Sequence, residues 1–328
     1  ISNMSKSNTF SIVLVGCGNI GVRHLEGLLK LDKKISISIV EPNLTTQKSV
    51  QSYLSKFEYD EISHTINWYD SVKQLDSFSD LTIVATTSID RVDLIEKLLE
   101  KGHLRFLIEK IVCQSDTEYK QLLLNLEKYG AKGWINTNRR YFSFYQKIKP
   151  FFSSEYPITM KVTAGNKGLG SNALHYVDLF NWFIENTSTK LDGSKLHKKI
   201  FPNKRNPQLM EFAGIINGIN GKSNLIISFF PNDNSSIIVE IFNEKNCISI
   251  DEITENIISS LGFSSDLTFE YEHVSSLTTK ITNDILTNDI CLLPSAEELY
   301  FIHKEIFQIF NTHIKRIRNE DTKLCPIT

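Results

Sequence analysis

The chain has 328 residues, with 36 Lys and Arg against 38 Asp and Glu, and a formal net charge of −2. Hydrophobic residues make up 41% and charged residues 23%, which is ordinary for soluble globular proteins, and the length suits about two domains. A nearly neutral chain lacks the overall positive field with which proteins hold nucleic acids or anionic membranes. We therefore expect no nucleic-acid partner and no membrane partner.

The five cysteines are widely separated, and none belongs to a Cys-x-x-Cys pair. This pattern favours neither a disulfide framework nor a metal site, and it is typical of proteins of the reducing cytoplasm. No apolar run reaches the roughly 18 residues of a membrane span, and residues 1–8 are polar, without the apolar stretch of a signal peptide. We expect a cytoplasmic protein without a bound metal, and we leave residues 1–8 out of the fold prediction.

The first part of the chain alternates short apolar strands with helices of about a dozen residues. The predicted strands are 10–15, 35–40, 81–85, 104–108 and 134–136. The predicted helices are 20–31, 44–56, 89–100 and 115–129. This alternation predicts a parallel sheet covered on both faces, an α/β Rossmann domain over residues 9–137.

The pattern changes after about residue 140. A predicted strand and helix are followed by strand-like segments that Gly, Asn, Asp and Pro separate, as in an antiparallel meander. These elements are 160–164 and 171–184, then 211–219, 224–230, 236–242 and 247–250, and a final helix at 295–316. We expect an α+β domain over 138–328 with a largely antiparallel open sheet, whose last helix is a candidate to pack back on the Rossmann domain.

A glycine pattern, Gly16-x-Gly18-x-x-Gly21, lies between the first predicted strand and the first predicted helix. Gly16 permits a tight turn, Gly18 lets a pyrophosphate approach the backbone, and Gly21 lets the helix pack close to the sheet. The free N–H groups at the helix start, around Asn19 and Ile20, can receive phosphates. The alternative is a purely structural turn, but strand, loop and helix in register favour dinucleotide binding.

Glu41 ends the second predicted strand, 41 − 21 = 20 residues after the last glycine of the loop. An acidic residue at this position accepts hydrogen bonds from the adenosine ribose. A carboxylate there also repels a 2′-phosphate, and no Arg follows it closely. We therefore expect NAD as the cofactor, with NADP the less favoured alternative.

Two further groups of polar residues stand where a ligand could bind. Glu109-Lys110 ends the fourth predicted strand, and the carboxyl ends of parallel strands line the ligand crevice of such sheets. A lysine there could supply a proton or a positive charge to a substrate oxygen, although a solvated Glu-Lys pair is the simpler interpretation. Arg139 lies at the domain junction, where it could bind a carboxylate or phosphate on a substrate or serve a structural role.

Taken together, the chain resembles the glucose–fructose oxidoreductase/inositol dehydrogenase family, Gfo/Idh/MocA, from the first strand through the last helix. The matching segments are Gly16–His24, Val84–Ser88, Glu109-Lys110, Asn138–Tyr141 and His175-Tyr-Val-Asp178. The resemblance implies hydride transfer between NAD(P) and a hydroxyl-bearing carbon of a sugar, cyclitol or nucleotide sugar. It also implies that Thr86, Thr87, Glu109 and Lys110 lie along the cofactor.

By the same resemblance, Lys110 lies near the reacting oxygen, His175 donates and accepts the proton, and Asp178 orients or charges the histidine. Substrate would be bound by Lys110, Arg139, Ser171 and His175. Residues three apart on a helix share a face, and an imidazole suits reversible proton transfer at neutral pH. Without the resemblance, His175 reads as a partly buried helix histidine.

Three positions depart from the family pattern. Ile111 replaces the proline that usually follows Glu-Lys, Thr87 replaces the proline of a Thr-Pro pair, and Ser171 stands where many members carry Asp, four residues before the histidine. A hydroxyl cannot act as a carboxylate base, although it can cap a helix. The leading hypothesis is an NAD-dependent oxidoreductase that acts on CH–OH groups, and the alternative is a catalytically inactive NAD-binding regulator or scaffold of the same fold.

The resemblance also bears on setting and assembly. Leu292-Leu-Pro294 and Cys325–Thr328 look like members linked to surface-polysaccharide sugar synthesis. An open antiparallel sheet often forms symmetric contacts through its exposed face, and in this family that face commonly builds dimers. We expect a homodimer or a tetramer formed through the sheet.

Overall fold

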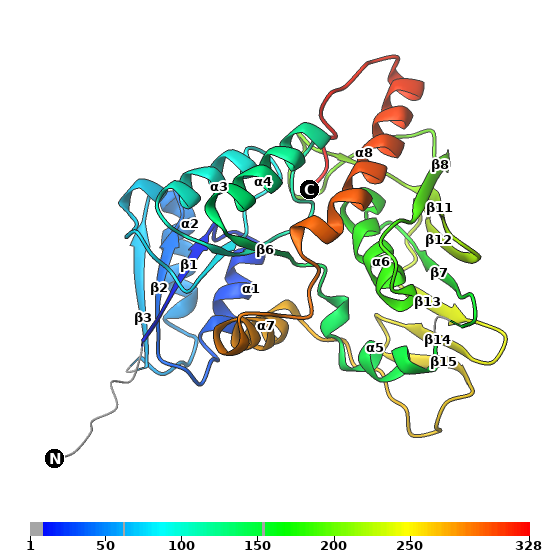
Figure 1. Cartoon of the computed structure of the whole chain (residues 1–328), viewed down its shortest axis with the longest axis horizontal. Helices are drawn as coiled ribbons and strands as arrows, with labels where there is room; N and C mark the ends of the chain where they lie inside the picture. The colour runs from blue at the N-terminus through cyan, green and yellow to red at the C-terminus, as the bar shows by residue number, and fades with distance from the viewer. Residues whose placement is uncertain (1–8, 62, 153–154) are drawn as a thin grey trace. The chain divides into compact units, whose positions relative to one another are not determined.

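The computed structural model describes residues 9–61, 63–152 and 155–328, so the polar segment 1–8 lies outside the described residues. Two compact units make up the chain (Figure 1). The first comprises the chain up to Glu109 together with Lys120–Asn136 and His273–Ser295. The second comprises Lys110–Tyr119, Thr137–Glu272 and Ala296–Thr328. Glu109 and Lys110 are therefore neighbours in the chain that belong to different units.

The first unit contains a six-stranded sheet with the strand order β3-β2-β1-β4-β5-β6, in which every pairing is parallel. Its strands are β1 (Phe10–Val15), β2 (Ile35–Val40), β3 (His64–Tyr69), β4 (Leu81–Val84), β5 (Arg105–Ile108) and β6 (Lys132–Ile135). The connecting helices are α1 (Asn19–Leu28), α2 (Leu44–Leu54), η1 (Val72–Gln74), α3 (Arg91–Glu100) and α4 (Asp116–Tyr129). The predicted Rossmann-type parallel sheet is thus confirmed.

The edge strand β3 was not predicted from the sequence. Its residues, His-Thr-Ile-Asn-Trp-Tyr, are mostly polar or amphipathic, and only the first of them is buried. Central strands such as β4 are buried along their whole length and therefore read as continuous apolar runs. An edge strand half exposed to solvent gives a much weaker signal.

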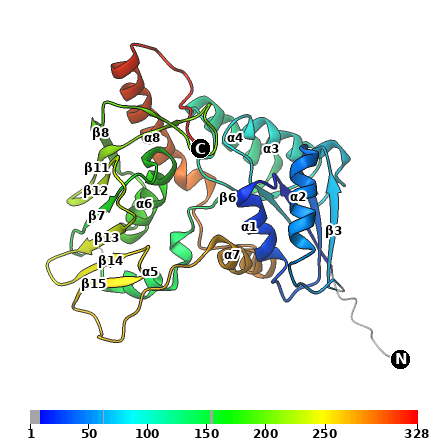
Figure 2. The ribbon, with the colours of Figure 1, turned by 180° about the vertical axis from the view of Figure 1, so that it is seen from behind.

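A late segment of the chain completes the first unit. Helix α7 (Val274–Asn288) packs against α1, and Figure 2 shows the two helices side by side. A side chain at Gly27 would bring its Cβ within 2.3 Å of the Ser275 carbonyl oxygen, so the two backbones can approach only because residue 27 is glycine. The hydroxyl of Thr279 donates to the Gly27 carbonyl at 2.7 Å.

The second unit is built on a seven-stranded sheet with the order β15-β14-β13-β7-β12-β11-β8. Its strands are β7 (Thr159–Ala164), β8 (Lys190–Leu196), β11 (Gly214–Asn220), β12 (Ser223–Phe229), β13 (Ile237–Phe242), β14 (Cys247–Asp251) and β15 (Asn256–Leu261). All pairings are antiparallel except that of β7 with β12. The predicted largely antiparallel sheet is confirmed. A short ribbon of β9 (Phe201–Pro202) and β10 (Met210–Glu211) lies outside it.

Helices pack on one face of this sheet. They are η2 (Asn138–Tyr141), α5 (Ser143–Ile148), η3 (Lys149–Phe151), α6 (Leu169–Ile184) and α8 (Ala296–Arg318). Helix α6 contacts β12 and α8, and α8 contacts β8. Along β12, buried Leu225, Ile227 and Phe229 alternate with less buried residues, which is the pattern of a strand with one face in a core.

The last helix, a candidate to pack back on the Rossmann domain, belongs to the second unit, where α8 contacts β8 and α6. The apolar residues of α8 that serve this packing include Leu299, Ile302 and Ile306, all fully buried. Their helical spacing predicts a buried face but not the element that covers it.

Among the described residues, no helix combines the length and apolarity that a membrane crossing requires. No disulfide joins any of the five cysteines. Within the same residues, no group of three or more His, Cys, Asp or Glu side chains is arranged to hold a metal ion.

Candidate functional site

The glycine loop has the geometry that its sequence pattern predicts. Gly16 has a φ of +86°, in the left-handed region that favours glycine. A Cβ on Gly21 would come within 2.2 Å of the Gly16 carbonyl oxygen, whereas a Cβ on Gly18 would meet no protein atom within 4 Å. Gly16 and Gly21 are therefore required by the turn itself, and the open space beside Gly18 is where a phosphate group can approach the backbone.

The first turn of α1 faces this loop. Gly18 is the N-cap, no side chain caps the helix within the described residues, and the earliest intrahelical bond runs from Val22 N–H to the Gly18 carbonyl at 2.9 Å. The N–H groups of Asn19, Ile20 and Gly21 lie ahead of that bond, where helices have donors for anions. The residues present thus fit the diphosphate of a dinucleotide.

Glu41 is fixed beside the glycine loop. Its two carboxylate oxygens accept from the backbone N–H groups of Cys17 at 2.9 Å and Asn43 at 3.0 Å. Each carboxylate oxygen can accept a further hydrogen bond, so Glu41 keeps the capacity to accept from ribose hydroxyls. This placement at the carboxyl end of β2 fits the adenosine half of the dinucleotide.

Arg91, which the sequence analysis did not single out, ties the ends of β4 and β5 together. Its side chain is 1% exposed, and its guanidinium donates to the Thr86 carbonyl, to the Glu109 carbonyl and, at 3.5 Å, to the Thr86 hydroxyl. Thr87, which follows Thr86 in the chain, has an exposed side chain. A positive charge in the first turn of a helix opposes the helix dipole, and that conflict was the available signal for a special role.

Glu109 is held in a buried network and is only 6% exposed, so the interpretation of a solvated Glu-Lys pair does not hold for it. One carboxylate oxygen is 2.7 Å from His24 Nε2 and 2.7 Å from the Asn136 side-chain nitrogen. His24 Nδ1 is 2.8 Å from the Thr278 hydroxyl, which donates its own hydrogen to the Val274 carbonyl. The two ring nitrogens of His24 thus link Glu109 to Thr278.

In the second unit, Lys110 and His175 meet at one residue of α6. Lys110 Nζ donates to the Ser171 carbonyl at 2.8 Å, and the peptide bond between Lys110 and Ile111 is cis. In an α-helix the carbonyl of residue 171 is also the acceptor for the backbone N–H of residue 175. Two of the sequence-predicted site residues are thus linked through the third.

His175 has the surroundings of a proton acceptor. It is buried, and its Nδ1 has no hydrogen-bond partner among the described residues. Burial lowers the pKa of His175 well below its ordinary value, and the charges of Arg139 and Lys110 lower it further. The imidazole is therefore neutral at neutral pH, with an unused polar atom.

Asp178 does not orient His175 in the way that we expected. Its carboxylate accepts from Arg140 at 3.0 and 2.5 Å and from the Thr137 hydroxyl at 2.8 Å. Arg140 also donates to Glu298 of α8 at 2.7 Å. Burial raises the pKa of Asp178, and the Arg140 charge opposes that effect. Asp178 thus binds α6 to η2 and, through Arg140, to α8.

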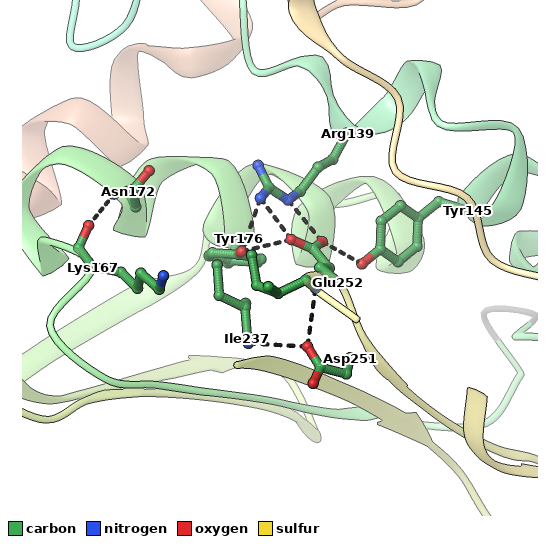
Figure 3. Close-up of polar contacts among 9 residues, drawn as sticks. Arg139, Tyr145, Lys167, Asn172, Tyr176, Ile237, Asp251 and Glu252 are labelled. Carbon is green, nitrogen blue, oxygen red and sulfur yellow. Dashed lines mark hydrogen bonds and ion pairs between the residues drawn. The ribbon is translucent and has the colours of Figure 1, made fainter. Parts of the chain in front are cut away.

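Arg139 lies in a second buried network, drawn in Figure 3. It donates to both carboxylate oxygens of Glu252 at 3.0 and 2.8 Å and to the Tyr176 hydroxyl at 2.9 Å. The hydroxyls of Tyr145 and Tyr176 donate to the same carboxylate at 2.7 and 3.0 Å. Of the two alternatives for Arg139, this placement favours the structural role over direct contact with substrate.

Ser171 does not cap α6, because the helix already begins at Leu169 after the N-cap Gly168. Its hydroxyl and its backbone N–H both donate to Glu211, a residue of β10. Sequence reasoning missed Glu211 because the bond joins residues 40 positions apart and Glu211 belongs to no motif.

Comparison with known proteins finds a family whose sequence model resembles the N-terminal part of the chain. Residues 10–137 match the sequence model of the family GFO_IDH_MocA, described as an oxidoreductase family with an NAD-binding Rossmann fold. This range covers all six strands of the parallel sheet. The match agrees with the expected resemblance: residues 10–137 are similar in sequence to the NAD-binding Rossmann domain of this family, over less than half of the chain. A search of curated proteins finds no match to the sequence.

Solved structures extend the likeness over nearly the whole chain. The WlbA dehydrogenase from Bordetella pertussis, in complex with NADH and UDP-GlcNAcA, has 14% identity and a TM-score of 0.67, covering 98% of each chain. The UDP-N-acetylglucosamine 3-dehydrogenase GnnA from Acidithiobacillus ferrooxidans has 12% identity and a TM-score of 0.68, covering 94% of this chain and 99% of the other.

A third similar structure is a super-repressor mutant of Gal80p from Saccharomyces cerevisiae. It has 12% identity and a TM-score of 0.69, and the match covers 94% of this chain and 97% of the other. At such identities the three likenesses show a shared fold and nothing finer.

Proposed function

We propose that the protein is an NAD-dependent dehydrogenase that moves a hydride between nicotinamide and a hydroxyl-bearing carbon of a sugar, cyclitol or nucleotide sugar. The observation that carries this proposal is the contact of Lys110 Nζ with the Ser171 carbonyl, one helical turn before buried His175, whose Nδ1 has no hydrogen-bond partner among the described residues. An ammonium group and a neutral imidazole are the charge stabiliser and the proton acceptor that oxidation of an alcohol requires. The oxidoreductase family of the first domain supports the same class of reaction.

The first unit would hold the cofactor. The backbone around Gly18 and the first turn of α1 would receive the diphosphate, and Glu41 would accept from the adenosine ribose. We favour NAD over NADP because the Glu41 carboxylate would repel a 2′-phosphate. When bound, NAD supplies the acceptor for the hydride.

In the oxidising direction, His175 accepts the proton of the substrate hydroxyl, while the carbon–hydrogen bond breaks and its electron pair leaves with the hydrogen. Lys110 stabilises the negative charge that develops on the substrate oxygen. The products are a carbonyl compound and a protonated His175, which returns its proton to solvent. Asp178 contributes indirectly, because its partners Arg140 and Thr137 fix the helix that carries His175.

Among the substrate classes, nucleotide sugars have the most support. Two similar structures are of a dehydrogenase in complex with a UDP-sugar acid and of a UDP-N-acetylglucosamine dehydrogenase. The resemblance of the C-terminal sequence to proteins of surface-polysaccharide sugar synthesis agrees with this class. Synthesis of such sugars in the cytoplasm is the setting that we propose.

The test is a substrate screen that follows absorbance at the reduced-nicotinamide band. The purified protein would be incubated with NAD, and in parallel with NADP, against UDP-sugars, UDP-sugar acids, free sugars and cyclitols. We expect reduction of NAD by at least one UDP-sugar or related acid. If no member of these classes reduces either cofactor while the protein binds NAD, the proposal of a dehydrogenase fails.

The alternative of an inactive regulator or scaffold is the weaker hypothesis. The inactive alternative is motivated by Ser171, which stands in place of an acid. The super-repressor mutant of Gal80p also has a similar fold. However, Lys110 and His175 are both present, Lys110 Nζ contacts the helix that carries His175, and the other structures named above are dehydrogenases. The enzyme is therefore the hypothesis that we carry forward.

We also propose a homodimer or tetramer formed through the sheet of the second unit. On β11, exposed Ile219 alternates with buried Gly218 and Ile216, and Leu261 of β15 is 70% exposed. Apolar side chains on a sheet face that no helix covers are typical of a protein interface.

A further inference from the structure

We propose that Glu211 is a positioning residue of the active site: its carboxylate fixes the first turn of α6 through Ser171, and thereby sets Lys110 and His175 for proton transfer. The inference rests on the proposed dehydrogenase function for its consequence, but the contacts that carry it lie entirely within the second unit. It would also explain how the chain works with serine where many family members carry an acid.

The first turn of α6 lacks a cap of its own. Its N-cap, Gly168, has a φ of +81° and no side chain with which to bond the following N–H groups. The N–H groups of the second and third helical residues normally need such a partner. Here Glu211 Oε1 accepts from both of them, Gly170 and Ser171 (3.2 Å for Ser171), and from its neighbour Phe212 at 3.0 Å.

The other carboxylate oxygen accepts from the Ser171 hydroxyl. The direction of this bond follows from a third contact, because the side chain of Asn203 donates to Ser171 Oγ at 3.3 Å. The hydroxyl hydrogen is therefore available for Glu211, which accepts from four donors in all. A carboxylate can satisfy all four, whereas an amide replaces one acceptor with a donor.

The surrounding chain leaves room for this carboxylate. A Cβ on Gly168 would come within 2.6 Å of one Glu211 oxygen, and a Cβ on Gly170 would come within 2.7 Å of the other. The turn before the helix is also tied down, since the Asn172 side chain donates to the carbonyls of Lys167 at 2.7 Å, drawn in Figure 3, and Gly168 at 3.0 Å. The glycines and the carboxylate therefore form one arrangement.

Ser171 transmits the effect to the reacting groups. Its N–H and hydroxyl donate to Glu211, and its carbonyl accepts from Lys110 Nζ at 2.8 Å. The N–H and the carbonyl of Ser171 belong to consecutive peptide groups, and each is bound to a charged group of the sign that favours its dipole, the N–H to the carboxylate and the carbonyl to the ammonium. Because helix geometry also gives this carbonyl to the N–H of His175, a shift of residue 171 moves both groups.

Glu211 is 8% exposed, so its charge is little screened by water. Burial raises the pKa of Glu211, and hydrogen bonds from Ser171, Phe212 and Gly170 act against that rise. The four donors therefore favour the charged form that the positioning role needs.

The first experiment compares Glu211→Gln with a matched control, Glu240→Gln, which changes a glutamate on β13 of the seven-stranded sheet in the same unit. With a substrate found in the screen, Glu211→Gln is expected to lower kcat about 10- to 100-fold, the effect of losing a charged hydrogen-bond acceptor, and to leave NAD affinity unchanged. The control should keep kcat. Unchanged kcat in Glu211→Gln would overturn the proposal.

The second experiment separates positioning from mere stability. In the double variant Ser171→Asp with Glu211→Gln, a carboxylate returns to the same turn, and we expect kcat to recover at least about 10-fold over Glu211→Gln. In Ser171→Asp alone, two carboxylates oppose each other and kcat should fall. If thermal unfolding accounts for the loss in Glu211→Gln and the double variant shows no recovery, Glu211 is only a helix cap and the proposal is wrong.

A third readout does not depend on turnover. Competitive acetylation, quantified by mass spectrometry at Lys110 relative to surface lysines, should give a rate in Glu211→Gln that is at least about twice that of the parent protein and of Glu240→Gln. An unchanged rate at Lys110 would contradict the proposal. If the labelling rate changes but the screen finds no substrate, the positioning by Glu211 stands and the dehydrogenase proposal fails.

Discussion

His175 and Asp178 lie one helical turn apart on α6, yet their side chains serve different purposes. Asp178 has its acceptor atoms engaged by Arg140 and Thr137, while His175 retains a buried Nδ1 without a partner among the described residues. Spacing predicts that two residues share a helix face, but the partners of each come from other parts of the chain. The carboxylate of Asp178 is therefore occupied by structural contacts, whereas the imidazole of His175 keeps an unused polar atom, although the sequence indicated that the two would act as a pair.

The low pKa of His175 predicts a pH dependence. A proton acceptor must be neutral, and burial keeps His175 neutral well below the ordinary imidazole value of about 6.5. The rate of alcohol oxidation should therefore show no acid limb centred near pH 6.5, and should fall only at lower pH. A kcat profile with a limb at about pH 6.5 that disappears in His175→Gln would contradict the buried imidazole.

The lowered pKa of His175 also makes the free energy of unfolding depend on pH. Because the folded pKa is depressed, the unfolded chain binds a proton at His175 below about pH 6.5 and the folded chain does not. His175 therefore makes stability decline as pH falls below that value. Urea unfolding at two pH values should show a smaller decline for His175→Gln than for the parent protein.

Glu41 offers a direct test of cofactor choice. Replacing it in Glu41→Ser removes the acceptor for ribose and the charge that repels a 2′-phosphate, so NAD affinity should fall roughly 10- to 100-fold and the preference over NADP should narrow. Fluorescence titration with both cofactors measures this. Glu58→Ser, an exposed residue beyond α2, is the control, and an unaltered NAD preference in Glu41→Ser would exclude the proposed ribose contact.

At the scale of the elements, the predictable parts were those whose local pattern alone decides the structure. β1 is a short, mostly apolar run and β2 alternates Ile with Ser. The glycine loop follows β1 directly, so strand, turn and helix could be predicted together. Helix α7 was missed, although buried Leu277, Ile281 and Ile285 recur every four residues, because Ser, Thr and Asn dominate the rest of it. Glu211 could not have been found, since only the folded chain brings it to Ser171.

The close contact of α1 with α7 predicts that Gly27→Ala destabilises the protein, the opposite of the usual effect of this substitution in a helix. Gly→Ala inside a helix ordinarily stabilises by about 0.5–1 kcal/mol. At Gly27 the new Cβ would lie 2.3 Å from the Ser275 carbonyl oxygen and 2.7 Å from the Thr278 Cβ, so Gly27→Ala should instead destabilise by about 1–3 kcal/mol. Urea unfolding measures the change. Ser49→Ala, on the exposed face of α2, should be neutral or stabilising, and a Gly27→Ala protein as stable as its parent would refute the close packing.

At the scale of the whole molecule, the residues proposed to bind the cofactor and those proposed to react with substrate belong to different units. The first unit contains the glycine loop, Glu41 and the buried hydrogen bonds of Glu109. The second unit contains Lys110, His175 and Glu211. The chain passes from one to the other between Glu109 and Lys110. The similarity of residues 10–137 to the oxidoreductase family follows from their sequence, whereas the contacts of Glu211 in the second unit belong to no motif.

The proposed assembly is tested by sedimentation at micromolar concentration. We expect a dimer or tetramer, and we expect Ile219→Lys to shift it towards monomer by placing a charge on the exposed sheet face. Leu124→Lys changes an equally exposed leucine on α4 and should leave the assembly intact. A parent protein that sediments only as monomer would rule out the sheet-mediated oligomer.

The most direct test of the central claim is a comparison of NAD reduction and NAD affinity in Lys110→Met and the parent protein. Methionine keeps most of the unbranched side chain, ending one atom shorter, and removes the charge that would stabilise the substrate oxygen. We predict that kcat falls by at least about 100-fold, while the dissociation constant for NAD changes less than about twofold. A Lys110→Met protein that turns over substrate at the parent rate would contradict the proposed mechanism.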